Sequence, residues 1–416
     1  MILLWRIFAR KPMLTVESMA KRTAKMAKCL NLTEWRACTL GEVKQFFDSS
    51  SRPDAPSRST LVIKSKLKPF DMYCYLVARF GQPNGIQNFL RKDDSDNLIH
   101  WDFNIMAEDV HVYFVGASRS VHLTIGESMS REEWLELIAS LKADFRKMGR
   151  EKSAVLNSLE KFSVFQNKFV SIADLCAEFH ERIPDVLSSA SIVKTEKILD
   201  DLDSYKKSMQ DLVEKSRQLF GNCLNLRLLT PVMAEAYINM VVLMFCPDTI
   251  RTDDAAYQNL LRMKIPDKIK KIGNICSGFV REIDTTTESY RHFLRVVNMR
   301  NFALHGNVDP VREQMETVYF DGRRPIFVRG GDNIETFFDN VERLCKPSEV
   351  IEDYEAVHIF LIEIADCLDG RTRAYFDQVI TDAYPGFELK KLRVTRLFPD
   401  HVATARWGNL LYDDQI

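Results

Sequence analysis

The sequence predicts a mainly α-helical protein with a smaller α+β domain in its N-terminal half. Apolar and polar residues partly alternate in three runs between residues 98 and 126, which is the period of β-strands. From about residue 151 onward, apolar residues instead recur every three or four positions, which is the period of α-helices. A polar, proline-containing segment, DSSSRPDAPSRS (48–59), precedes the alternating runs and indicates a linker.

The composition is that of a soluble globular protein. With 416 residues, 46% hydrophobic and 28% charged, the chain is long enough for two or three domains with cores of their own. We expect five segments in order: an N-terminal helical arm and linker (1–56), a small α+β domain (57–150), a helical connector (151–190), a helical bundle interrupted by a β-hairpin (191–376, hairpin 316–330), and a C-terminal tail (377–416).

Charge and cysteine usage narrow the function classes. The 57 Lys and Arg residues against 58 Asp and Glu leave a net charge of −1, so any nucleic-acid contact must be local. The nine cysteines show no Cys-x-x-Cys or Cys–His zinc spacing, which predicts reduced thiols in a cytoplasmic protein without a metal or cofactor. The first apolar run ends at Arg6, and no other stretch approaches transmembrane length. We therefore expect an N-terminal helical arm in preference to a transit peptide, and no membrane partner.

Each element of the 57–150 domain has its own signal. A strand is expected around TLVIKS (60–65) and a helix around DMYCYLVARF (71–80), followed by three strands in LIHWDFNI, VHVYFVGA and VHLTIG (98–126). Ser130 followed by Glu133 predicts a capping box that starts a closing helix, WLELIASLKADF (134–145). We expect this domain to act as a sensing, targeting or regulatory module.

The first half of the helical region contains two apolar series. Apolar residues from Leu156 to Phe179 predict one helix that ends by Pro184. A near-heptad series from Ile198 to Leu219 predicts a helix in a bundle core, with a dimerising coiled-coil seam as the alternative.

The second half contains a further helix, a hairpin and a final helical region. Thr230 and Pro231 predict a helix start in LTPVMAEAYINMVVLMF (229–245), with Thr230 as N-cap. The segment ETVYFDGRRPIFVRG (316–330) predicts a β-hairpin with Asp321-Gly322 in the turn. A last helical region is expected from about residue 349 to 368, resuming past Gly370.

The segment VVNMRNFALHGNV (296–308) places polar residues at the end of an amphipathic helix. At 100° per residue one apolar stripe comprises Tyr290, Phe293, Leu294, Val297 and Leu304. Asn301 and His305 fall within this stripe, Arg300 borders it, and Gly306 is placed to end the helix in a left-handed turn.

An acidic residue is similarly embedded in the helix at 229–245. Glu235 lies among its buried-face positions, and an unpaired carboxylate there is unfavourable. We expect Glu235 to have a partner, with Arg300 as the candidate. The structural alternative is that such an Arg–Glu pair joins two helices and that His305 contacts only the terminal carbonyls of its own helix.

These two segments resemble the HEPN superfamily. RNFALH (300–305) is similar to that family's Arg-x4-6-His motif with a polar residue after the Arg, and AEAYINMVV (234–242) resembles the family helix that often carries a Glu. The resemblance covers roughly residues 190–370 and implies a four- or five-helix bundle that dimerises with two Arg-His motifs in one cleft. It also implies a metal-independent ribonuclease, commonly a toxin or antiviral effector. In that role His305 would be the general acid/base, Arg300 the phosphate ligand and Asn301 an orienting group.

The residue types suit RNA cleavage. RNA supplies its own nucleophile, the 2′-hydroxyl, so the enzyme must transfer protons and stabilise a crowded phosphorane. Histidine titrates near neutral pH, and arginine stays charged and can bind phosphate oxygens bidentately. In the basic segment LRMKIPDKIKKI (261–272), Lys268 and Lys271 are candidate contacts to the RNA backbone, with a solvated helical face as the alternative.

Three functions follow from this reading. The first is a HEPN-type endoribonuclease with RNA as substrate, a homodimeric composite site, and an antitoxin or trigger ligand that controls it. The second is a non-catalytic HEPN-fold protein that binds nucleotide or RNA or acts as a dimeric scaffold. The third is a structural helical dimer in which Glu235 and Arg300 form an internal ion pair. The 316–330 hairpin is a candidate lid over the motif.

Overall fold

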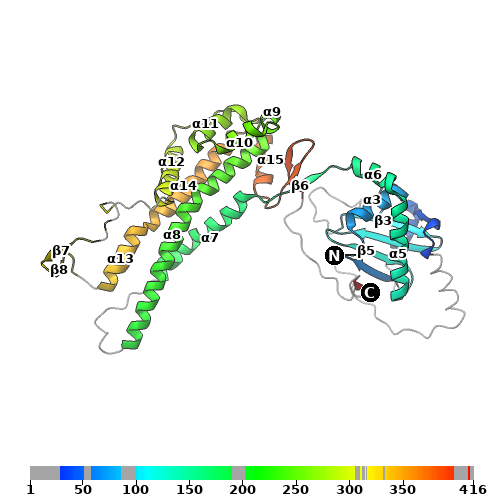
Figure 1. The fold of residues 1–416 in the computed structure, drawn as a ribbon, viewed down its shortest axis with the longest axis horizontal. Coiled ribbons are helices and arrows are strands. Elements are labelled where there is room, and N and C mark those ends of the chain that lie inside the picture. Colours follow the sequence, from blue (N-terminus) through cyan, green and yellow to red (C-terminus); the bar gives the residue numbers. More distant parts are fainter. Residues whose placement is uncertain are drawn as a thin grey trace. The chain divides into compact units, whose positions relative to one another are not determined.

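The chain folds into two compact units, each described here by itself. The computed structural model describes residues 29–50, 58–85, 99–189, 202–304, 310–311, 314, 316–330, 333–397 and 411–412. Residues 1–160 together with 398–416 form the first unit, and residues 161–397 form the second. The described chain is mainly helical, and its main β-sheet belongs to the first unit (Figure 1).

The first unit is built on a six-stranded sheet. Its strand order is β1-β3-β4-β5-β2-β11, and every neighbouring pair is antiparallel except β2 and β11. The strands are β1 (Trp35–Ala37), β2 (Ser59–Ile63), β3 (Trp101–Ala107), β4 (Val110–Gly116), β5 (Val121–Ile125) and β11 (Leu411–Tyr412). The expected strand at 60–65 and the three strands expected from alternation are therefore confirmed. Strands β1 and β11 come from the expected N-terminal arm and C-terminal tail.

Two helices share a core with one face of this sheet. The helices are α3 (Pro69–Phe80) and α5 (Arg131–Lys147), and buried residues from both join those of the strands in one apolar cluster. The predicted capping box is present: Glu133 N donates to Ser130 Oγ at 3.3 Å, and Ser130 N donates to the Glu133 carboxylate at 2.6 Å. The unit also contains η1 (Leu32–Glu34), α2 (Leu40–Ser50) and α6 (Gly149–Ser158).

Alternate residues of β3 and β4 form a polar layer that is buried on β3 and partly buried on β4. Asp102 and Asn104 are fully buried. The Tyr113 hydroxyl donates to Asp102 Oδ2 at 2.9 Å, and His111 Nε2 lies 2.9 Å from Asn104 Oδ1. Burial, assisted by the charge of Arg58, lowers the pKa of His111 to about 3. The imidazole is therefore neutral in the folded protein at neutral pH.

The second unit is organised around one long helix, α8 (Leu202–Phe245). Helices α7 (Lys168–Ser189), α12 (Glu288–Leu304), α13 (Asn333–Cys345) and α14 (Pro347–Ala365) pack against it, and α12 also packs on α14 (Figure 1). Shorter helices complete the unit: α9 (Asp248–Arg251), α10 (Asp254–Arg262), α11 (Ile265–Ile275) and α15 (Gly370–Ile380). A three-stranded sheet joins β6 (Phe162–Val164), β9 (Gly386–Glu388) and β10 (Arg393–Thr395).

Helix α8 corrects the expected start at Thr230. The helix is continuous for 44 residues and contains Pro231 in its interior. Thr230 does not cap a helix start; its hydroxyl donates to Leu226 O, four residues earlier, at 2.7 Å. Packing of α8 along four other helices outweighs the hydrogen bond that Pro231 cannot make. Leu212 and Leu219 are buried in the unit's core, as the bundle-core interpretation predicts.

The segment expected to be one helix from residue 156 to 179 is divided. Helix α6 ends at Ser158, β6 forms a strand, and α7 begins only at Lys168. Pro184 lies inside α7 rather than ending it. Because α7 packs along α8, residues 168–189 belong to the bundle and are not a connector between domains.

The predicted hairpin is present with a shifted turn. Strands β7 (Val318–Asp321) and β8 (Arg324–Phe327) pair antiparallel, and Asp321 faces Arg324. The two turn residues are therefore Gly322 and Arg323, with Gly322 at φ +61°, a conformation that favours glycine. The final helices α14 and α15 match the expected region, whereas α13 was not anticipated.

Helix α8 also corrects the expectation that no segment has transmembrane length. Over Lys206–Phe245 it is long and apolar enough to cross a bilayer, by length and composition alone. Its most apolar window is 61% buried inside the protein, as in the central helix of a bundle.

Candidate functional site

The helix that carries Arg300 is held in the core by its first three turns. On α12 the rings of Tyr290 and Phe293 contact Phe360 of α14, with centroids 5.5 and 4.9 Å apart. Val296 and Val297 are buried as well. Asn301 and Leu304 are exposed, Leu304 to 60%. The buried part of the apolar stripe therefore ends at Val297, and the expected burial of Leu304 is wrong, since most of its surface remains accessible.

Arg300 and Asn301 interact with each other at this exposed end. The Arg300 guanidinium donates to Asn301 Oδ1 from Nη2 at 3.2 Å and from Nε at 3.4 Å. Arg300 is half-buried, so its head group lies near the surface while part of its stem is covered. His305 and Gly306 lie outside the described residues. The structure thus presents two of the motif's three polar residues at the protein surface.

Glu235 has a different partner from the one expected. Its Oε1 lies 3.6 Å from Nζ of Lys268 on α11. The same ammonium donates to Asn239 Oδ1 at 2.9 Å and to the Leu261 carbonyl at 2.6 Å. Burial lowers the pKa of Lys268, and the Glu235 carboxylate offsets part of that effect. The α8 carboxylate is therefore joined to α11, not to Arg300 on α12.

This geometry separates the two lysines proposed as RNA contacts. Lys268 has no exposed surface and three oxygen atoms around its Nζ, so it joins α11 to the core and does not face a substrate. The expected substrate contact at Lys268 is thus corrected, and the physical reason is that α11 turns this position toward α8. Lys271 is exposed and remains a candidate contact to a polyanion, and Lys264 and Lys270 of the same segment are exposed as well.

A charged cluster that the sequence reasoning missed lies earlier on α12. Asp353 of α14 is buried, and its Oδ1 lies 2.6 Å from both His292 Nε2 and Arg295 Nη2. One turn away on α14, burial raises the pKa of Glu349, but Lys346, Arg295 and Arg227 together bring it below its ordinary value. Cations from α8, α12 and the α13–α14 junction thus surround two carboxylates of α14.

Spacing alone contained a weak signal for this cluster. His292 and Arg295 are three apart on α12, and Glu349 and Asp353 are four apart on α14, so each pair shares a helix face. The missing information was which two faces meet, because that depends on how α12 crosses α14. Sequence periodicity does not specify that crossing.

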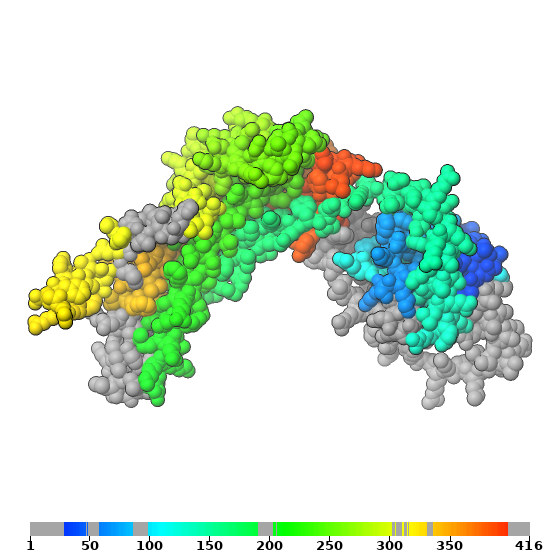
Figure 2. Space-filling view, viewed as in Figure 1, coloured from blue at the N-terminus to red at the C-terminus, as the bar shows by residue number. Residues whose placement is uncertain are grey.

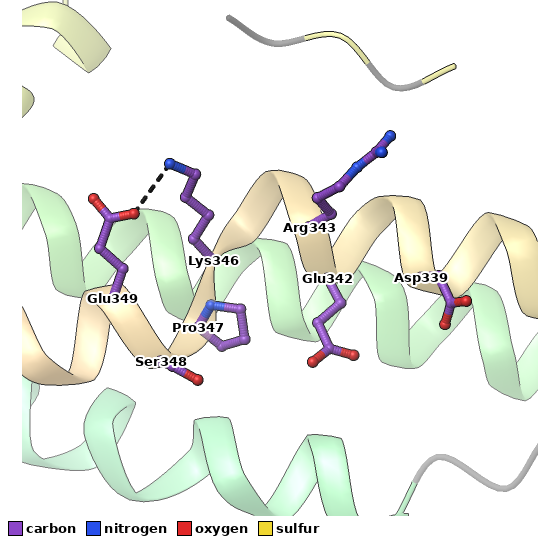
Figure 3. Close-up of a pocket in the computed structure, with 7 residues that line it drawn as sticks. All are labelled: Asp339, Glu342, Arg343, Lys346, Pro347, Ser348 and Glu349. Carbon is purple, nitrogen blue, oxygen red and sulfur yellow. Dashed lines mark ion pairs between the residues drawn. The ribbon is translucent and has the colours of Figure 1, made fainter. Parts of the chain in front are cut away.

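A shallow pocket lies where α13 meets α14. Its volume is about 410 Å³. The lining residues are Asp339, Glu342, Arg343, Lys346, Pro347, Ser348 and Glu349. Lys346 adopts a left-handed conformation, φ +48°, at the junction and pairs with Glu349 at 3.1 Å. Figure 3 shows the side chains of Arg343 and Glu342 directed away from each other, so this surface does not converge charged groups on one ligand atom.

No family of proteins is identified by comparison. No family model, curated protein or solved structure matches the chain. Within the described ranges, no three His, Cys, Asp or Glu side chains are grouped so as to hold a metal ion. The assignment of function therefore depends on the residues and their geometry.

Proposed function

We propose that the protein is a metal-independent endoribonuclease of HEPN type, with Arg300, Asn301 and His305 as its active-site residues. The observation that carries the proposal is the exposed C-terminal turn of α12. Arg300 and Asn301 are joined there by hydrogen bonds and are available to a substrate. An internal ion pair between Arg300 and Glu235, the structural alternative, has no support, because Glu235 is paired with Lys268.

In the proposed mechanism the substrate supplies the nucleophile. His305 removes the proton of the 2′-hydroxyl, which attacks the adjacent phosphorus. The bond to the 5′-oxygen of the next nucleotide breaks, this oxygen takes a proton from the general acid, and a 2′,3′-cyclic phosphate remains. Arg300 binds the phosphate oxygens while negative charge builds up on them. The Asn301 carboxamide accepts from the Arg300 guanidinium and so positions it for this contact.

A second copy of the chain completes the proposed site. Attack by the 2′-oxygen needs a base for this oxygen and an acid for the leaving 5′-oxygen, on opposite sides of phosphorus. One motif contains a single histidine and so supplies only one of these groups. We propose that two motifs face each other in a homodimer. Because such an activity would harm the cell that makes it, we also propose control by an antitoxin or a trigger ligand, with the α+β unit as the sensing module.

Induced expression in bacteria tests the proposal in cells. The wild type is expected to slow growth and fragment cellular RNA, whereas Arg300→Ala and His305→Ala leave both unaffected. Lys271→Ala, on the exposed face of α11, is expected to weaken cleavage without abolishing it. Intact RNA with the wild type at a protein level matched to the variants, tested with and without phage challenge as a trigger, would count against the enzyme.

The alternative is a non-catalytic protein of the same bundle type that binds nucleotide or RNA. One observation favours it. Glu235 of α8 is the glutamate in the segment that resembles the HEPN helix. It is paired with Lys268 and is therefore separate from the Arg300 side chain. Binding of RNA by the wild type without cleavage, unchanged by His305→Ala, would support this alternative.

A further inference from the structure

The β7–β8 hairpin presents an unusual surface for so short an element. Residues 319–330 are all exposed. The exposed apolar side chains are 53% to 67% accessible, and they are Tyr319, Phe320, Ile326, Phe327 and Val328. The two strands pair with each other and form no extensive contact with any described helix. Figure 2 shows the hairpin, in yellow, with its side chains open to solvent on the viewed face.

The pairing register divides these side chains between two faces. Val318 faces Phe327, and Phe320 faces Pro325, so the two phenylalanines lie diagonally across one face. Tyr319 and Ile326 face each other on the opposite face. Diagonal neighbours on a sheet lie roughly 7–8 Å apart. Both rings are mostly accessible, so planar groups of a ligand can reach them.

The charges of the hairpin are mainly positive. Between Val318 and Gly330 there are three arginines, Arg323, Arg324 and Arg329, and one acidic residue, Asp321. All four are exposed. The chain as a whole has a net charge of −1, so this positive balance is local. The surface therefore complements a polyanion that also carries flat, apolar rings.

We propose that the β7–β8 hairpin is a docking surface for single-stranded RNA. Phe320 and Phe327 stack with unpaired bases, and the arginines contact the phosphates on either side. Exposed aromatic rings combined with cationic side chains are the means by which proteins bind single strands, because every base has a π-face. This inference rests on the proposed function and deepens it, since it assigns the substrate class and the element that binds it.

The binding test uses RNA that cannot be cut. Fluorescence anisotropy is measured with the full-length protein and a labelled 2′-O-methyl uridine strand of roughly 16 nucleotides, the upper end of known site sizes. Because this strand lacks the nucleophile, binding is observed whether or not the protein is a ribonuclease. The Phe320→Ala/Phe327→Ala variant is expected to bind about thirtyfold to a thousandfold more weakly. The matched control Tyr384→Ala, an exposed aromatic between α15 and β9, is expected to bind like the wild type.

Two further variants separate stacking from other kinds of docking. Phe320→Leu/Phe327→Leu keeps the surface apolar but removes the rings, so RNA binding is expected to fall as it does with alanine. Phe320→Trp/Phe327→Trp keeps the rings and is expected to restore binding. Arg323→Gln and Arg329→Gln are each expected to reduce the salt dependence of binding by about 0.7 in the log–log slope.

Several outcomes would overturn the proposal. They are unchanged affinity in the alanine pair, retained binding in the leucine pair, or no RNA binding by the wild type. Binding of the hairpin to anionic lipid vesicles but not to RNA would identify a membrane surface instead. If the uncuttable strand binds through the hairpin but natural RNA is not cleaved, the proposed enzyme fails and the docking surface stands. If RNA is cleaved equally well by every hairpin variant, the proposed enzyme stands and the docking surface fails.

Discussion

At the scale of single residues, the polar groups of the helical unit have distinct tasks. Lys268 and Asp353 are buried ions with several partners each, so they hold helices together. Arg300 and Asn301 bond only weakly to each other, at 3.2 and 3.4 Å, and lie at an exposed helix end. The proposed catalytic role requires this second environment, because the groups would have to exchange partners with the substrate.

Replacement of Asp353 tests the buried cluster. Asp353→Ala removes the acceptor shared by His292 and Arg295 and is expected to lower the free energy of unfolding by about 2 kcal/mol. Thermal unfolding followed by far-UV circular dichroism measures the change. The neighbouring Glu352→Ala, on the exposed face of α14, is the control and should change stability by less than about 0.5 kcal/mol. Equal effects at both positions would contradict the assignment.

The partly buried His111 predicts a pH dependence in the first unit. The unfolded chain binds a proton at His111 near its ordinary pKa of 6.5, whereas the folded pKa is about 3. As the pH falls from 6.5 toward 3, the unfolded state binds more protons, so the unfolding free energy decreases, by up to about 1.4 kcal/mol per pH unit. Above pH 6.5 this contribution is fully present.

Tryptophan fluorescence in urea measures this effect, since all five tryptophans belong to the first unit. The variant His111→Gln can still donate to Asn104. Its unfolding free energy is expected to change less between pH 7 and pH 5 than that of the wild type, and the difference should match the contribution of one titrating group. Parallel pH curves for the two proteins would show that His111 is not held neutral by the fold.

At the scale of elements, the strands were easier to predict than the helix boundaries. Strands β3 to β5 alternate because one face joins the apolar core, and that constraint is local. The predicted helix start at Thr230 and the predicted helix end at Pro184 were wrong. Pro231 and Pro184 both lie inside helices that long-range packing stabilises. Helix α13 was not predicted because it too depends on long-range packing, in this case against α8.

The two helical prolines give a test at this scale. Pro231→Ala and Pro184→Ala each restore a backbone N–H within a helix, and each is expected to stabilise the helical unit by about 1 kcal/mol. The gain should be smaller at Pro231, which is buried and leaves a small void, than at the exposed Pro184. Urea unfolding followed by far-UV circular dichroism gives the comparison. Destabilisation by both changes would mean that the packing requires the distortion each proline introduces.

At the scale of the whole molecule, the sequence separates an α+β unit from a helical unit, and the structure agrees. In the structure the boundary between the units lies between residues 160 and 161, and residues 398–416 belong to the first unit. The membership of residues 398–416 in the first unit could not be predicted, because the parallel pairing of β11 with β2 joins segments about 350 residues apart and has no local signal. Arg300 and Asn301 were singled out because polar residues interrupt an apolar helix stripe, which is a local pattern, whereas the pairing of Glu235 with Lys268 depends on how α8 meets α11.

The most direct test of the central claim is the chemistry of cleavage by the purified protein in EDTA. Wild type is expected to cut single-stranded RNA and leave 2′,3′-cyclic phosphate ends, with activity reduced by about a hundredfold or more in Arg300→Ala and His305→Ala. The folded state and oligomeric state of the variants are checked in parallel. Products with 3′-hydroxyl ends, or cleavage that persists in both variants, would contradict the claim that these residues perform the reaction.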